Sequence, residues 1–368
     1  IGKLINGDVF VIANSSANSM IIDEADITGG NQVTFNGNDP IGLFKNDALI
    51  DIIGVLNNDT DFAKDKTLRR KSSVISPNTI YTISEWDSLD KDTFSGIGSH
   101  IVSGTNTFLG TTDRDWDTLS NWSFGSVPSN SNVIIKTGQT VIASGNIFVA
   151  NLTLESNSKL TVADNISNSG TINLNSNASL IAPNSTEFNL TSNTYLETTK
   201  WYLISSSVRN ETLQNIISSH NFATGLNSNI GIGDYVNTNP GWEYATSSSS
   251  GILSSGKGHS VKLSQAGNIS FSGSMSLDNN SIQISDGGAS GNGFNLIGNP
   301  YPSYITANHT SPSNSNNLLS ANSGILAEQT IWFWRQVDQE YKQINQASAL
   351  IDGIRHIPPG QGFFVKSN

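Results

Sequence analysis

The sequence contains no cysteine, which excludes disulfide bonds and thiol chemistry. Charged residues are scarce at 13%, and 19 basic against 30 acidic residues give a net charge of −11. The basic surface that duplex nucleic acid or an anionic membrane requires is therefore missing. No apolar run approaches the ~20 residues of a membrane-spanning helix. We expect neither a nucleic-acid partner nor insertion into a membrane.

The polarity of the chain comes instead from Asn, Ser, Thr and Gly, which serve turns and strand surfaces better than helix interiors. Hydrophobic residues make up only 36% of the sequence, yet they recur at strand spacing, and seven Trp residues need burial. A chain of 368 residues is too long for one ordinary core. These features predict an all-β protein of two or three domains.

The first region contains a clear hairpin pattern. Apolar residues alternate over 41–44 and 48–55, and Lys45-Asn46-Asp47 between them is a tight polar turn. Further strands are expected over Asp8–Asn14 and Thr79–Ser84.

The first region also contains five ordered motifs: Gly7 to Ala17, Ala25-Asp26-Ile27, Asn36-Gly37-Asn38-Asp39, Thr67-Leu68-Arg69-Arg70-Lys71, and Ser84-Glu85-Trp86 to Gly98-Ser99-His100. In this order they resemble the bacterial lamin tail domain of secreted Bacteroidetes proteins. The resemblance implies an immunoglobulin-like β-sandwich over residues 1–104 that lacks the family's first strands. Such a truncated sandwich should expose an unpaired edge and part of its core face.

Residues 105–193 repeat with a period near 20, and apolar residues alternate within each unit. This predicts a short parallel β-solenoid, in which each coil buries its apolar residues only by stacking on the next. A small antiparallel sandwich with coincidental spacing is the alternative. Asn at the Ser156-Asn157 and Ser176-Asn177 bends can adopt left-handed geometry. The repeated positions are Val133, Ile135 and Val141; Leu152, Leu154 and Leu160; and Ile172, Leu174 and Leu180.

The pattern of residues 194–368 predicts a β-sandwich whose strands are separated by Gly-Asn-Pro and Pro-Gly turns, with one short helix over Leu213–His220. Its motifs are Lys200 to Ser206, Gly241-Trp242-Glu243-Tyr244, Ser255 to His259, Phe294 to Ser303, Ile331-Trp332-Phe333-Trp334, and Ile357 to Lys366. Together they resemble a module of Bacteroidetes proteins that are exported by the type IX secretion system.

Asp113, Asp115 and Asp117 alternate in one loop, and such carboxylates can bind calcium. An EF-hand would need Gly and Glu where this chain has Thr118 and Phe124, so we favour a solvated acidic turn. No cofactor is expected apart from this calcium hypothesis.

Two further groups have both a functional and a structural interpretation. Arg69-Arg70-Lys71 could contact phosphate, but we favour one Arg paired with a carboxylate inside the fold. Trp332 and Trp334 could stack on sugar rings, although core packing is the stronger interpretation.

Two tripeptides are candidates for glycosylation. Asp87-Ser88-Leu89 and Asp117-Thr118-Leu119 resemble the acceptor motif for O-linked glycans in exported Bacteroidetes proteins, with Ser88 and Thr118 as acceptors. None of the five histidines lies in a recognisable metal or catalytic motif.

Together these features predict a non-catalytic modular region of a secreted or cell-surface bacterial protein. The resemblances imply a cargo of the type IX system with an adhesion, display or spacer role, on the outer surface of a Gram-negative cell or outside it. Expected partners are the export machinery, other surface proteins or a glycan. The alternative is the accessory region of a secreted nuclease or polysaccharide-degrading enzyme whose catalytic domain lies outside this chain.

Overall fold

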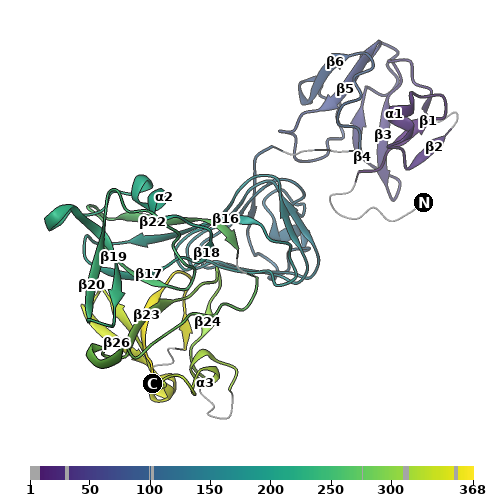
Figure 1. Ribbon diagram of the computed structural model, residues 1–368. Helices are drawn as coiled ribbons and strands as arrows, with labels where there is room; N and C mark the ends of the chain where they lie inside the picture. The colour runs from purple at the N-terminus through teal and green to yellow at the C-terminus, as the bar shows by residue number, and fades with distance from the viewer. Residues whose placement is uncertain are drawn as a thin grey trace. The chain divides into compact units, whose positions relative to one another are not determined.

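The computed structural model in Figure 1 describes residues 9–29, 33–98, 100, 103–275, 277–309, 315–351 and 355–368. Strands account for 39% of the structure and helices for 9%, so the all-β prediction is confirmed. Contacts divide the chain into two units, Ile1–Val133 with Phe148–Ala150 and Ile134–Ile147 with Asn151–Asn368. Among the described residues, no helix is long and apolar enough to cross a membrane.

In the first part of the first unit, the described residues form three two-stranded ribbons and a one-turn helix, α1 (Ser19–Ile22). The predicted hairpin is confirmed, because Asn46 and Asp47 have φ of 51° and 63°, as a tight hairpin turn requires. The ribbons are β1 (Ile12–Asn14) parallel to β2 (Ile27–Gly29), β3 (Ile41–Lys45) antiparallel to β4 (Ala48–Ile53), and β5 (Lys66–Arg70) antiparallel to β6 (Trp86–Asp90).

Strand β3 is exposed along its whole length, and its only ladder partner among the described residues is β4. Leu43 is 60% exposed and Phe44 59%, so large apolar side chains lie on the surface here. Within the described residues β3 therefore has an open edge, and the assignment of this region to a truncated sandwich stays a prediction.

Two strand predictions in this unit need correction. The strand expected over Asp8–Asn14 is limited to Ile12–Asn14, and Asp8 lies outside the described residues. The strand expected over Thr79–Ser84 is wrong. The chain there pairs with no strand of the described structure and enters a 3₁₀ helix, Ile83–Glu85, while Ile80 is 73% exposed.

An aromatic cluster closes the first unit beside β7 (Thr105–Phe108) and the 3₁₀ helix Leu119–Asn121. Trp116 and Trp122 are each 2% exposed, and their ring centroids lie 4.7 Å apart in an edge-to-face arrangement. The indole nitrogen of Trp122 donates a 2.7 Å hydrogen bond to the carbonyl of Trp116, which satisfies the buried donor.

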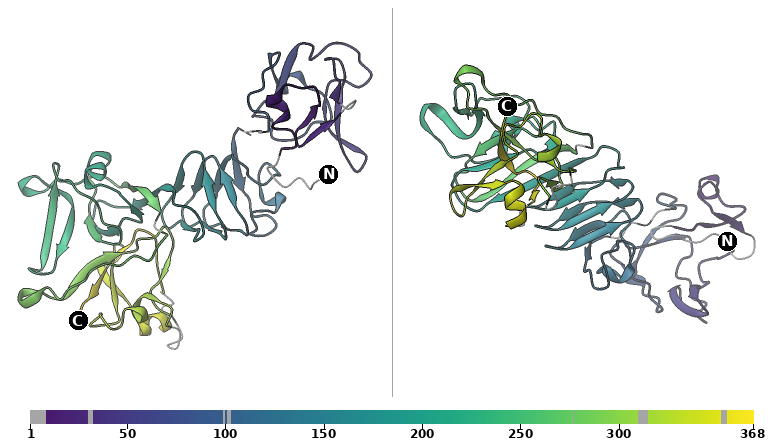
Figure 2. Two further views of the ribbon diagram at one scale, coloured as in Figure 1. Left: turned by 45° about the vertical axis from the view of Figure 1, so that its right-hand side comes forward. Right: turned by 90° about the horizontal axis from the view of Figure 1, so that it is seen from below.

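The predicted parallel solenoid is confirmed, and the antiparallel alternative is wrong. Leu152 pairs in parallel register with Ile172, and Leu160 lies between Val141 and Leu180. The strands lie side by side as stacked rungs in Figure 2. The solenoid strands are β8 (Asn132–Ile135), β9 (Thr140–Ala143), β10 (Ile147–Val149), β11 (Leu152–Leu154), β12 (Lys159–Val162), β13 (Ile166–Asn168), β14 (Ile172–Leu174) and β15 (Ser179–Ile181).

The predicted bends are confirmed as a column of left-handed residues. Gly138, Asn157 and Asn177 have φ of 74°, 62° and 60° at equivalent positions of successive coils. The backbone N–H of Gly138 donates to Ser156, and that of Asn157 donates to Ser176, so each bend is bonded to the next coil. Gly and Asn recur because they tolerate this conformation best.

The solenoid continues without a break into the C-terminal module. β16 (Asn189–Leu196) pairs in parallel with β14 and, along its full length, antiparallel with β22 (Gly267–Met275). Figure 1 shows β16 and β22 side by side. The predicted boundary between residues 193 and 194 therefore falls inside a strand.

The C-terminal module is built on two four-stranded sheets, ordered β17-β21-β19-β20 and β23-β28-β25-β26. They pack through an aromatic cluster around Leu203, Leu296 and Phe364. Their strands are β17 (Tyr202–Ser205), β19 (Asn229–Val236), β20 (Gly241–Thr246), β21 (Gly258–Val261), β23 (Phe294–Gly298), β25 (Ile331–Arg335), β26 (Glu340–Ile344) and β28 (Gly362–Lys366).

Short elements complete this module. The predicted helix is confirmed as α2 (Leu213–Ser219), which begins after Thr212 because the Thr212 hydroxyl accepts a hydrogen bond from the N–H of Asn215. The others are β18 (Val208–Arg209), β24 (Ile305–Thr306), β27 (His356–Ile357), α3 (Leu318–Ala321) and α4 (Gln346–Ile351).

Candidate functional site

The basic cluster of the first unit is occupied by internal contacts. Arg70 has a side chain only 14% exposed, and one guanidinium nitrogen lies 2.6 Å from both carboxylate oxygens of Asp51. Its other terminal nitrogen lies 2.6 Å from Glu85. Arg69 donates to the carbonyl of Ser95, and Lys71 donates to the carbonyl of Ser84. This arrangement fits the structural interpretation rather than a phosphate contact.

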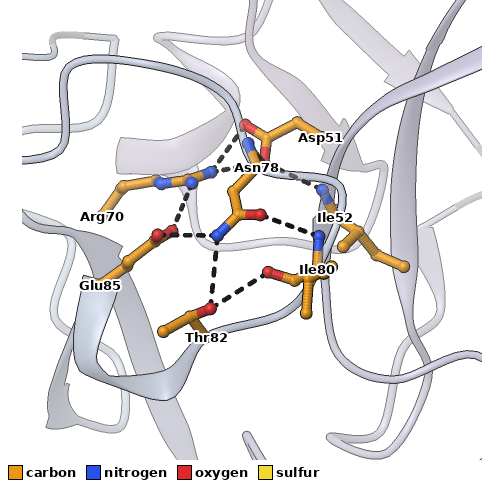
Figure 3. A network of polar contacts seen from close by, with 7 residues as sticks. All are labelled: Asp51, Ile52, Arg70, Asn78, Ile80, Thr82 and Glu85. Atoms are coloured by element: carbon orange, nitrogen blue, oxygen red, sulfur yellow. Dashed lines mark hydrogen bonds and ion pairs between the residues drawn. The ribbon is translucent and has the colours of Figure 1, made fainter.

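Asn78 joins the two carboxylates that hold Arg70 (Figure 3). Its backbone N–H donates to Asp51, and its side-chain amide donates to Glu85 at 2.8 Å and to Thr82 at 3.3 Å. Burial acts to raise the pKa of Asp51, but the bonds from Arg70 and Asn78 outweigh it and hold that pKa below its usual value. The network therefore ties β4, β5 and the 3₁₀ helix together through charge.

The calcium candidates form a self-bonded acidic turn. The backbone N–H of Asp115 donates to the carboxylate of Asp113 at 2.8 Å, and that of Asp117 donates to Asp115 at 3.0 Å. The buried Asn121 donates its amide to Asp113 at 2.7 Å. The bond from Asp115, followed by that from Asn121, lowers the pKa of Asp113.

The carboxylates of this turn thus accept bonds from their own loop. Within the described ranges, no three His, Cys, Asp or Glu side chains gather closely enough to hold a metal ion. Calcium binding at Asp113, Asp115 and Asp117 remains a prediction.

The two glycosylation candidates differ in accessibility. Ser88 lies on β6 with an exposed side chain. The hydroxyl of the half-buried Thr118 donates to Asp113 at 3.1 Å, so it is engaged in the acidic turn. Glycosylation at either residue stays a prediction, with Ser88 the more accessible acceptor.

Trp332 and Trp334 lie on the side of β25 that packs against the facing sheet. Both are half-buried against the Leu203 and Phe364 cluster, and the Trp332 ring meets Phe294 edge to face at 5.3 Å. The indole of Trp334 donates to Gln336. Their surroundings are those of core residues, and sugar binding by this pair remains a prediction.

A cluster of polar side chains that the sequence analysis missed, Asp234, Lys257 and His259, lies at the sheet β17-β21-β19-β20. Nδ1 of His259 on β21 is 2.6 Å from a carboxylate oxygen of Asp234 on β19, and Lys257 pairs with the other oxygen. The side chain of His259 is 5% exposed. Its Nε2 is buried without a hydrogen-bond partner among the described residues.

The surroundings of Asp234 favour its ionised form over its protonated form. Burial acts to raise its pKa, but the hydrogen bond with His259 and the charge of Lys257 outweigh burial and lower the pKa to about 2. A carboxylate on Nδ1 holds the imidazole in one orientation and leaves Nε2 for another group. Asp234, Lys257 and His259 line a cavity of about 330 Å³.

Only one sequence signal pointed to this group. Lys257 directly precedes β21 and is two residues from His259, so in an extended chain the two side chains share a face. Asp234 lies 25 residues away from His259, and its position opposite the histidine depends on the pairing of β19 with β21, which no local pattern specifies.

Residues 107–368 match a family model. The chain belongs to this family, described as Domain of unknown function (DUF8693). The DUF8693 match covers the solenoid together with the C-terminal module, and it begins after the residues that carry the lamin tail resemblance. No curated protein and no solved structure matches the chain.

Proposed function

We propose that this chain is a non-catalytic modular region of a secreted or cell-surface bacterial protein, exported by the type IX system, in which the solenoid acts as a spacer. The observation that carries the proposal is the unbroken passage from solenoid to sandwich through β16. A strand shared by two modules leaves no flexible linker between them, as a spacer that presents a terminal module requires.

The side-chain ladders of the solenoid support the same role. The carboxamide oxygen of Asn146 accepts from the N–H of Asn165 in the next coil, and that of Asn165 accepts from Thr186 in the coil after, each at 3.0 Å. These bonds run along the stacking direction and add to the backbone ladders. They stiffen the stack without any disulfide, which suits a cysteine-free chain.

The lamin tail assignment of residues 1–104 and the type IX route are parts of this proposal, supported by the ordered motifs and by the β3–β4 hairpin formed over them. A display or adhesion role follows from placing the C-terminal module at the end of the solenoid.

The test is localisation in the producing bacterium, with and without a working type IX translocon. We expect externally added protease to cleave the protein on intact wild-type cells, and the protein to accumulate inside the translocon mutant. Equal surface exposure in both strains would refute the export route. Assays of the purified chain on DNA and on polysaccharides address the alternative, and measurable turnover would refute the non-catalytic role.

A further inference from the structure

The ribbon of β3 and β4 lies in a part of the chain that buries few apolar side chains. In the described part of residues 9–98, Ile52 is the only large apolar side chain that is buried. Ile41, Leu43 and Phe44 of β3 are all exposed. Contiguous apolar surface on a folded protein usually marks a site of interaction. The exposed apolar row of β3 is therefore a candidate for contact with another chain.

The backbone of β3 also has one edge without a partner in the described structure. The ladder to β4 places Gly42 opposite Ile52. The N–H of Ile52 donates to the carbonyl of Asn78, so Ile52 faces away from β3 and does not bond with Gly42. Backbone groups alternate in direction along a strand, so Gly42 and Phe44 both direct their N–H and C=O groups to the open edge. Such an edge is a template for a further strand.

A second copy of β3 fits this edge, and charge favours one register. With Gly42 opposite the same glycine of the second copy, Lys45 lies opposite Asp39 on both sides of a two-fold axis. Both side chains are exposed, and neither forms an ion pair within the described residues. With Leu43 on the axis instead, Asp39 lies opposite Asp47 twice, and like charges in that position are destabilising.

The register centred on Gly42 also joins the apolar side chains of the two copies. Leu43 lies opposite Ile41, and these residues share one face of β3, so four apolar side chains meet across the axis. On the other face, Phe44 lies opposite Pro40, which has no N–H that the pairing would leave without an acceptor. Glycine on the axis leaves room for the ring of Phe44, because a Cβ at Gly42 would meet that ring at 2.9 Å.

We propose that two copies of this chain associate by pairing β3 with β3 in antiparallel register about Gly42, which forms a four-stranded sheet β4-β3-β3-β4. The same edge serves both copies, so the two-fold axis closes the assembly as a dimer. One short strand from each copy makes a small interface, so the dimer exchanges with monomer. The inference depends on the first unit alone and requires neither the lamin tail assignment nor the export route.

The first test is sedimentation velocity of the full chain from about 1 to 500 μM, the range of dissociation constants expected for a weak dimer. We expect monomer to convert to dimer over this range. Lys45→Glu should weaken association about 2- to 30-fold, because two attractions become two repulsions. Adding Asp39→Lys to that variant should restore association. Lys200→Glu is the matched control, since it makes the same change of net charge at an exposed residue of the second unit and should leave association unchanged.

Two results of this test would overturn the proposal. Monomer at every concentration would show that copies do not pair, and would leave β3 for a strand of another polypeptide. Equal weakening by Lys45→Glu and Lys200→Glu would show that the net charge governs association and not the edge of β3.

The second test measures the register in a chain that has no cysteine of its own. Ile41→Cys and Leu43→Cys are prepared separately, one of them labelled with nitrogen-15 so that intact mass distinguishes the two. Oxidation of the mixture should give the mixed disulfide, because residues of a non-hydrogen-bonded pair bring their Cβ atoms within reach of a disulfide. Preferential linkage of Leu43→Cys to itself would refute this register. Ile80→Cys, on a side chain 73% exposed, gives the rate of random collision, and a mixed disulfide that forms no faster would refute the contact.

Discussion

The left-handed column of the solenoid gives the sharpest prediction about stability. Gly138 has φ of 74°, and a Cβ added there would meet nothing within 4 Å. Gly138→Ala therefore introduces backbone strain without any steric clash. The left-handed conformation costs a residue with a Cβ about 1–2 kcal/mol. The loss of unfolded-state freedom returns about 0.4–1 kcal/mol. We expect a net loss of about 1 kcal/mol, which lowers Tm by about 2–4 °C in a unit of ~150–250 residues.

Gly145 supplies the matched control. It lies in the same solenoid, an added Cβ would also meet nothing within 4 Å, and its φ is not in the left-handed range. Gly145→Ala should be neutral or slightly stabilising. Asn157→Gly should cost no more than a few tenths of a kcal/mol, whereas Asn157→Ala should cost about 1 kcal/mol, because only Gly and Asn adopt φ near 62° easily. Thermal unfolding followed by circular dichroism measures all four variants. Equal Tm values for Gly138→Ala and Gly145→Ala would refute the reasoning.

Three further predictions concern side chains. Leu154→Ala should lower the free energy of unfolding by about 3 kcal/mol because Leu154 is fully buried, whereas Ile142→Ala should lower it by under about 1 kcal/mol because Ile142 is 49% exposed. Equal losses of stability in urea unfolding would contradict the stacked core. Arg70→Met should lower the stability of the first unit by about 2–4 kcal/mol, because it leaves the carboxylates of Asp51 and Glu85 without their cation. Proteolysis of that unit should accelerate, and an unchanged rate would show that the network is dispensable. The lowered pKa of Asp234, about 2, means that its ionisation stabilises the fold above pH 4 and that this stability is lost as the pH falls through 2. Allowing for solvent screening at 37% exposure, Asp234→Asn should lose about 1 kcal/mol at pH 7, and its stability should converge with wild type near pH 2.

The solenoid was predictable because its information is local and repeated. The register of Leu152 on Ile172 is the repeat spacing read directly from the chain, and each bend is specified by the residue that occupies it. The same holds for the hairpin of β3 and β4, whose turn residues are adjacent in sequence. Local chemistry is enough wherever neighbouring residues in the chain also contact one another.

Thr79–Ser84 shows where a local pattern fails. Its alternation favours a strand, but a strand needs a ladder partner, and the side chain of Asn78 instead accepts a bond from the N–H of Ile80. The side chain also donates to Glu85, so this segment follows the charge network around Arg70. The network depends on Asp51, 19 residues before Arg70 in the sequence, and only the folded structure brings them together.

The group around His259 and the junction at β16 could not be derived from the sequence either, because both depend on contacts between residues far apart in the chain. β16 has one edge on a parallel rung and the other on the antiparallel strand β22. A second contact covers the neighbouring sheet of the solenoid, where the N–H of Leu180 donates to the carbonyl of Pro302 at 2.7 Å. Repeat stacks need their last coil covered, because an open rung exposes both apolar surface and unpaired backbone groups. Since the C-terminal module covers the last rung of both of these sheets, we expect each part to be less stable alone, and the family model that matches residues 107–368 includes both parts.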